Sequence, residues 1–141
     1  MTRIIFLFLI FTSVFANAQN KAQLADAQWK LVNISNLTTG KESIADTNCR
    51  ITLIFGSDGR YNGFSGWNYF GGKYQLSGEN NIKFEYARQT EMAGPAKCEF
   101  GEELLKSYPA VKTYSFEQDM LSLISDSLKI VFKKARIIFP D

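Results

Sequence analysis

The two cysteines are the residues of this 141-residue chain with the clearest chemistry. Cys49 and Cys98 form an even pair, and in an oxidising compartment such a pair is expected to be joined. Closing a loop of that length stabilises a folded chain by about 4 kcal/mol in the chain-entropy model. Two separate buried thiols or a metal pair are the alternatives, and the metal is disfavoured because no histidine is present to complete a site. We expect a structural disulfide and no metal.

The absence of histidine also excludes Ser-His-Asp and Cys-His mechanisms. Hydrolytic chemistry would then rest on carboxylates, and three of them cluster at Glu99, Glu102 and Glu103. Acidic residues near the start of a helix are more simply explained as complementing its dipole while they remain solvated. We therefore assign no catalytic residue and no cofactor, and we expect a protein that is not an enzyme.

The strongest binding candidates are four consecutive residues, Trp67, Asn68, Tyr69 and Phe70. Successive side chains of a strand point to opposite faces, so the four cannot all enter one core. At least one or two should face outward, where aromatic rings and amides make good recognition groups. Two other interpretations stay open. A bulge would turn the rings into the core, and Asn68 would hydrogen-bond its own turn.

The first eighteen residues have the order of a cleavable secretory signal. Arg3 gives a short basic region, residues 4–11 are apolar, and Ala16-Asn17-Ala18 is a small-x-small cleavage site. The apolar run is shorter than the roughly 20 residues that span a bilayer, although an N-terminal membrane anchor is the alternative. We expect cleavage after Ala18, no stable membrane insertion afterwards, and a periplasmic or secreted location.

The mature chain, residues 19–141, is long enough for one domain, whose core we place at about residues 28–139. Its formal charge is +1 instead of +2, because Arg3 is the one charge lost. A near-neutral chain gives no electrostatic reason to expect nucleic acid or anionic lipid as a partner. The sequence leaves the oligomeric state open.

Apolar and polar residues alternate along most of the mature chain, which predicts strands with one buried face. Val32 breaks the alternation in the first of them. Asp58-Gly59 lies between two such runs and predicts a hairpin. The expected strands are residues 29–34, 51–55, 60–63, 74–76, 82–86, 112–117, 120–124 and 128–132, with 136–139 as a further edge strand.

Four segments depart from this alternation. Apolar residues at helical spacing predict one helix over residues 99–106. Residues 19–27 are predicted to be a polar leader, and 35–48 a loop. The glycine-dense segment 63–74 carries five aromatic rings, which favours bends or close backbone approach over a flexible linker. The expected fold is mostly β (α+β): a single antiparallel meander, forming a curved sheet or a partly open barrel, with one helix packed on it.

Several short motifs occur in an order and spacing that is similar to a known family. They are Trp29-Lys30-Leu31, Ile51-Thr52-Leu53-Ile54-Phe55, Asp58-Gly59-Arg60, Gly63-Phe64-Ser65-Gly66, residues 68–74, Thr90-Glu91-Met92-Ala93 and Leu121-Ser122-Leu123. In these the chain resembles the META domain family, also called the HslJ-like family after a heat-shock-related bacterial member. The family usually has cysteine where this chain has Trp67 and Gly94. If those two positions are neighbours, the Trp67 indole fills the space beside Gly94.

The resemblance implies a mostly antiparallel β domain in an envelope-associated or secreted protein linked to stress responses, without enzymatic activity. We expect a non-enzymatic envelope protein that binds another macromolecule, such as an envelope protein, through residues 63–74. The alternative is a carrier whose curved sheet encloses a small apolar ligand, as small barrels can. A third interpretation is an unrecognised carboxylate enzyme.

Overall fold

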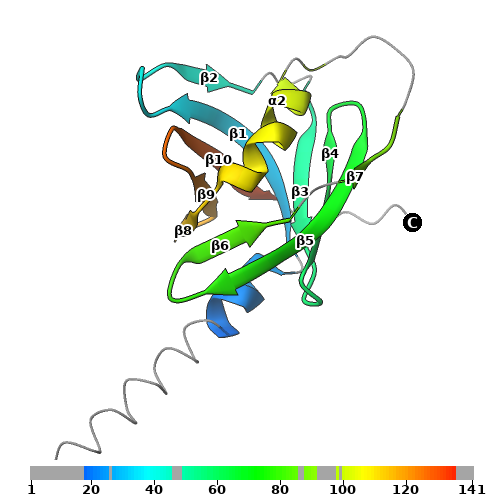
Figure 1. The fold of residues 1–141 in the computed structure, drawn as a ribbon, viewed down its shortest axis with the longest axis vertical. Coiled ribbons are helices and arrows are strands. Elements are labelled where there is room, and N and C mark those ends of the chain that lie inside the picture. Colours follow the sequence, from blue (N-terminus) through cyan, green and yellow to red (C-terminus); the bar gives the residue numbers. More distant parts are fainter. Residues whose placement is uncertain are drawn as a thin grey trace, which may run out of the picture.

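The alternating segments of the sequence form strands in the computed structural model, which describes residues 18–25, 27–45, 49–85, 88–91, 98 and 100–135 (Figure 1). The bounds of the named elements are β1 Gln28–Asn36, β2 Glu42–Ile44, β3 Ile51–Phe55, β4 Arg60–Ser65, β5 Tyr69–Ser77, β6 Asn81–Phe84, β7 Arg88–Gln89, α2 Phe100–Ser107, the 3-10 helix η1 Tyr108–Ala110, β8 Thr113–Glu117, β9 Met120–Ile124 and β10 Leu128–Ala135. Residues 1–17 of the predicted signal and the predicted edge strand at 136–139 lie outside the described residues. Within the described ranges, no helix is long and apolar enough to cross a membrane.

Eight strands close into an antiparallel barrel. Each pairs with the next in the order β1, β3, β4, β5, β6, β8, β9, β10, and β10 returns to β1. This last pairing runs from Gln28 opposite Ala135 to Asn36 opposite Leu128. The mostly β fold with a packed helix is confirmed. The expected open meander or partly open barrel is wrong, because the last strand covers the free edge of the first along its whole length, which removes an exposed edge.

A β-bulge in β1 allows this strand to pair with three other strands. The register between β1 and β10 shifts between Leu31 and Asn33, and Val32 lies at the shift. A bulge bends its strand and increases its twist. The first part of β1 therefore pairs with β3, while the part beyond the bulge pairs with β2. The break in alternation at Val32 is the sequence counterpart of this bulge, and β2 corrects the predicted loop over residues 35–48.

Aromatic rings fill the barrel interior beneath helix α2. Tyr108 lies at the centre, with its ring centroid 5.2 Å from that of Phe84, 5.8 Å from Phe70 and 6.1 Å from Tyr61. All four residues are at most 4% exposed. Burial raises the pKa of Tyr61 to about 12 and also raises the pKa of Tyr108, so both phenols stay neutral at physiological pH.

Replacement of each buried tyrosine by phenylalanine should have opposite effects on the free energy of unfolding. Tyr61 donates its hydroxyl to the Glu85 carbonyl at 2.9 Å, whereas the Tyr108 hydroxyl has no hydrogen-bond partner within the described part of the chain. We expect Tyr108→Phe to raise the free energy of unfolding by about 1 kcal/mol and Tyr61→Phe to lower it by about 1 kcal/mol, because a buried unpaired hydroxyl is costly. Urea denaturation measures both. A destabilised Tyr108→Phe variant would contradict the prediction and indicate a bound water on that hydroxyl.

Residues 18–24 form a second helical segment, at the opposite end of the barrel from α2 in Figure 1. Leu24 is fully buried, and its carbonyl accepts a hydrogen bond from the Trp29 indole at 3.2 Å. Ala25 forms an isolated bridge with Phe55, and Ala27 is also buried. The prediction of a polar leader over residues 19–27 is therefore wrong in part, since the core starts before residue 28.

Helix α2 lies against strand β4 at a position where only glycine fits. Gly101 is buried, and a side-chain carbon there would collide with the backbone carbonyl of Ser65. Glycine lowers the helix propensity of this segment, and the close approach of Ser65 is the compensating reason for a glycine at this position. This close contact places the helix across the strands, so that Tyr108, directly after it, enters the interior.

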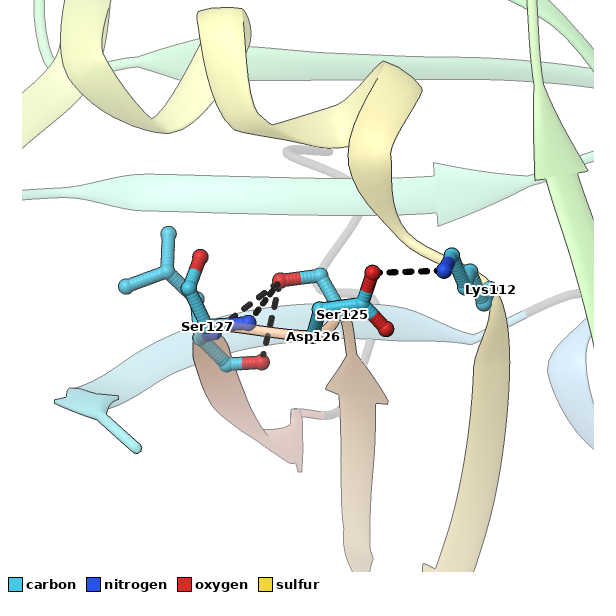
Figure 2. A network of polar contacts seen from close by, with 5 residues as sticks. Lys112, Ser125, Asp126 and Ser127 are labelled. Atoms are coloured by element: carbon cyan, nitrogen blue, oxygen red, sulfur yellow. Dashed lines mark hydrogen bonds and ion pairs between the residues drawn. The ribbon is translucent and has the colours of Figure 1, made fainter. Parts of the chain in front are cut away.

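The turn between β9 and β10 returns the chain to β1 (Figure 2). The Ser125 hydroxyl oxygen accepts hydrogen bonds from the amides of Ser127 and Leu128, at 3.3 and 3.0 Å. Lys112 pairs with Asp126 at 2.6 Å across this turn, but both side chains are largely exposed. Exposed ion pairs contribute little stability. The hydrogen bonds to the buried Ser125 hydroxyl therefore stabilise this turn more than the Lys112–Asp126 ion pair does.

Candidate binding surface on strands β4, β5 and β7

Alternation along β4 and β5 separates an inner from an outer face. In the hairpin they form, Phe64 lies opposite Tyr69, Asn62 opposite Gly71, and Arg60 opposite Lys73. The residues between them, such as Tyr61 and Phe70, are buried in the barrel. We call the six outward residues the outer hairpin face; they are Arg60, Asn62, Phe64, Tyr69, Gly71 and Lys73.

The four predicted binding residues are buried to different extents. Tyr69 is 64% exposed, and its ring centroid lies 5.1 Å from that of Phe64 on the outer hairpin face. Phe70 is 4% exposed and belongs to the core, so it leaves the candidate surface. Trp67 and Asn68 are half-buried at the tip of the hairpin. Tyr69 and Phe70 adjoin in sequence and thus point to opposite faces, as the alternation of side chains along a strand predicts.

Asn68 is engaged in its own turn, as one interpretation of the sequence proposed. Its carbonyl accepts from the Ser65 amide at 2.8 Å, and its amide donates to the Ser65 hydroxyl at 3.1 Å. Its side-chain oxygen accepts from the Thr90 hydroxyl at 3.3 Å. The Thr90 amide in turn donates to the Tyr69 carbonyl at 2.9 Å. Asn68 therefore helps to hold the segment that contains β7 beside β5.

A hollow of about 400 Å³ lies where β7 runs along β5, and Tyr69 is two positions before Gly71 of its lining on the same face of β5. It is lined by Arg60, Asn62, Gly71, Gly72, Lys73, Glu85 and Arg88. Two glycines in succession leave space at this point of the strand. A side-chain carbon on Gly71 would approach the Asn62 side-chain oxygen to 2.7 Å, so glycine keeps room for that amide.

No sequence pattern indicates this hollow, because its three cations are far apart in the chain. Arg60, Lys73 and Arg88 are 13 and 15 positions apart, so no basic run marks them. The one local signal is Gly71-Gly72, since a pair of glycines inside a strand indicates close approach of another group. Only the register of β4, β5 and β7 brings the cations together.

A comparison with models of protein families shows to which family this chain belongs. The model of the META domain matches residues 22–136. This chain belongs to the META domain family. No curated protein matches it.

Three solved structures are similar to this META domain in fold. The first, an NMR structure of a protein from Burkholderia xenovorans, has a TM-score of 0.68 at 19% identity and covers 82% of this chain and 86% of its own. A DUF4847 family protein from Bacteroides vulgatus has a TM-score of 0.55 at 14% identity, covering 78% and 93%. A further NMR structure has a TM-score of 0.57 at 20% identity, covering 80% and 92%. At these identities the likeness concerns the fold alone.

The predicted disulfide between Cys49 and Cys98 is present in this META domain. Their Cα atoms are 5.3 Å apart, and both residues are buried. Gly66 lies against the bridge with φ 90°, and a side-chain carbon there would approach the Cys98 Cβ to 2.6 Å. The bridge thus adjoins the hairpin tip that carries Trp67. Gly94 lies outside the described residues, so the packing of Trp67 beside it stays a prediction.

The disulfide is also evidence about the cellular compartment in which the protein is found. Disulfides persist in oxidising environments and are rare in the cytosol. The Cys49–Cys98 bridge is therefore consistent with an extracytoplasmic protein.

Proposed function

We propose that this META domain is an exported, non-enzymatic binding module of the cell envelope, and that it binds a partner macromolecule through the outer hairpin face. The observation that carries the proposal is Tyr69, a large aromatic residue that is 64% exposed beside Phe64, on the same strand face as Gly71 and Lys73 of the polar hollow. Aromatic residues dominate binding energy at interfaces because they offer large, rigid contact areas. A ring held at the surface next to charged groups has the composition of such a site.

Export rests on the predicted signal and on the disulfide. Cleavage after Ala18 leaves Leu24, which packs into the core, on the mature chain. The mature protein would be periplasmic or secreted, where the disulfide is stable. The link to stress rests on the HslJ-like resemblance. Intact mass of the protein from its own envelope should correspond to a chain that starts at Gln19, and retention of residues 1–18 would count against export by cleavage.

The carrier alternative fits the closed barrel only weakly. A small barrel can hold one ligand when its lumen is open. Here the rings of Tyr61, Phe70, Phe84 and Tyr108 occupy the interior below α2. An apolar ligand would have to displace these rings, so binding on the outer hairpin face is the better supported function.

Site-specific photo-crosslinking in the native envelope tests the proposal. We expect p-benzoylphenylalanine at position 69 to give a discrete adduct, because Tyr69 points away from the core. The matched control is the same residue at position 129, where Lys129 is also exposed but lies on β10. Equal labelling at both positions, or none at position 69 in a folded protein, would contradict the proposed function.

A further inference from the structure

Three basic residues from three strands line the hollow between β5 and β7. Arg60 on β4 lies directly opposite Lys73 on β5, and Arg88 on β7 lies opposite Gly71. Like charges directly opposite each other on neighbouring strands are destabilising. Fold stability therefore gives no reason for placing Arg60 opposite Lys73, whereas an anionic ligand between them would.

The local charge balance fits a doubly charged anion. The lining residues carry three cations and one carboxylate, Glu85, which amounts to +2. Glu85 is engaged by the Gln75 amide, which donates to it at 3.2 Å. Asp58 lies 3.8 Å from Arg60, but both side chains are more than half exposed, so the guanidinium is weakly held. A phosphate monoester carries about −1.5 to −2 at neutral pH and therefore matches this balance.

The donor types also fit phosphate. Arginine guanidinium groups bind phosphate oxygens in a forked geometry, and lysine adds a mobile point charge. Asn62, opposite Gly71, contributes an amide with two N–H donors. The volume of about 400 Å³ lies in the lower range of small-ligand sites, so there is room for more than a single phosphate group.

We propose that this hollow binds the phosphate of a phosphorylated saccharide, with Arg60, Lys73 and Arg88 holding the phosphate and Tyr69 packing against the sugar ring. The inference rests on the proposed function, because it names the chemistry of the partner at the same face. The formal charge of the whole chain is near zero and conceals this local cluster. Binding should weaken as salt rises, since the cations are exposed.

NMR titration of the oxidised mature protein tests the inference. We expect glucose 6-phosphate to shift the amide signals of Asn62, Gly71 and Gly72 saturably, with a Kd on the order of 1 mM. Glucose should cause no shift, and inorganic phosphate should bind at least about threefold more weakly, because it lacks the ring. Equal affinity for inorganic phosphate, or no saturable shift with the sugar phosphate, would overturn the proposal.

A charge-matched pair of variants separates a site from general attraction. Lys73→Gln/Arg88→Gln should weaken glucose 6-phosphate binding about tenfold or more, since it removes two charged donors. Lys129→Gln/Lys133→Gln makes the same charge change at exposed positions of β10 and should alter the affinity less than about twofold. Equal loss in both variants would overturn the site. If the adduct at position 69 persists in Lys73→Gln/Arg88→Gln, the proposed function stands and the phosphate inference fails.

Discussion

Cys49→Ala/Cys98→Ala should lower the free energy of unfolding by about 4 kcal/mol, the largest effect that we expect of any change in this protein. The bridge closes a loop over a sequence separation of 49, and the unfolded chain gains that loop's freedom when the bridge is lost. The bridge also joins a residue two positions before β3 to a residue two positions before α2. Urea denaturation of the variant and the oxidised wild type measures the difference.

Reduction of the wild type provides the control. A reductant should lower the stability of the wild type by a similar amount and leave that of the double variant unchanged. A loss below about 1 kcal/mol, far under the chain-entropy value, would show that the unfolded chain already keeps the two segments close. The amide signals of Gly66 and its neighbours should shift most on reduction, because Gly66 touches the bridge.

Leu24→Ala should lower the free energy of unfolding by about 3 kcal/mol, although Leu24 lies in a segment whose sequence is mostly polar. Its side chain is fully buried, and its carbonyl receives the Trp29 indole N–H. Truncation would leave a cavity in the hydrophobic core. Gln23→Ala is the matched control, since Gln23 is the exposed neighbour and should change stability by less than about 0.5 kcal/mol.

The outcome of this pair decides where the folded domain begins. If Leu24→Ala is no more destabilising than Gln23→Ala, the helical segment 18–24 contributes nothing to the core. If the predicted loss is found, the segment directly after the predicted cleavage site is part of the fold. Deletion of residues 19–24 should then destabilise the protein at least as much as Leu24→Ala.

Local patterns predicted most strands well. The run Ile51–Phe55 forms β3 with the predicted bounds, because a short β-branched and aromatic run has few other favourable conformations. The Asp58-Gly59 hairpin is also confirmed, with Gly59 at φ 81°, a conformation that glycine adopts without strain. These features depend on neighbours within a few residues, which is the range that alternation and turn residues report.

The elements that were missed have no periodic pattern of their own. Strand β2 has only three residues with little burial, so no buried face marks it in the sequence. The segment 18–24 buries Leu24 at its end, too little for a helical stripe. Strand β2 is positioned by its pairing with β1, and the segment 18–24 by the bridge from Ala25 to the distant Phe55 end of β3.

By itself, the sequence determined the β class, the family, the pairing of Cys49 with Cys98, and the presence of an outward aromatic residue between Trp67 and Phe70. The β class and the outward aromatic residue follow from residue type and short spacing, the family from the order of its motifs, and the cysteine pairing from the presence of two cysteines in the chain. Tertiary structure alone decided that the barrel closes through β1 and β10, that Tyr69 faces outward while Phe70 is buried, and that Arg60, Lys73 and Arg88 meet in one hollow. These depend on strand register, in which a shift of one residue reverses every side chain, and register is set by contacts between residues far apart in the chain.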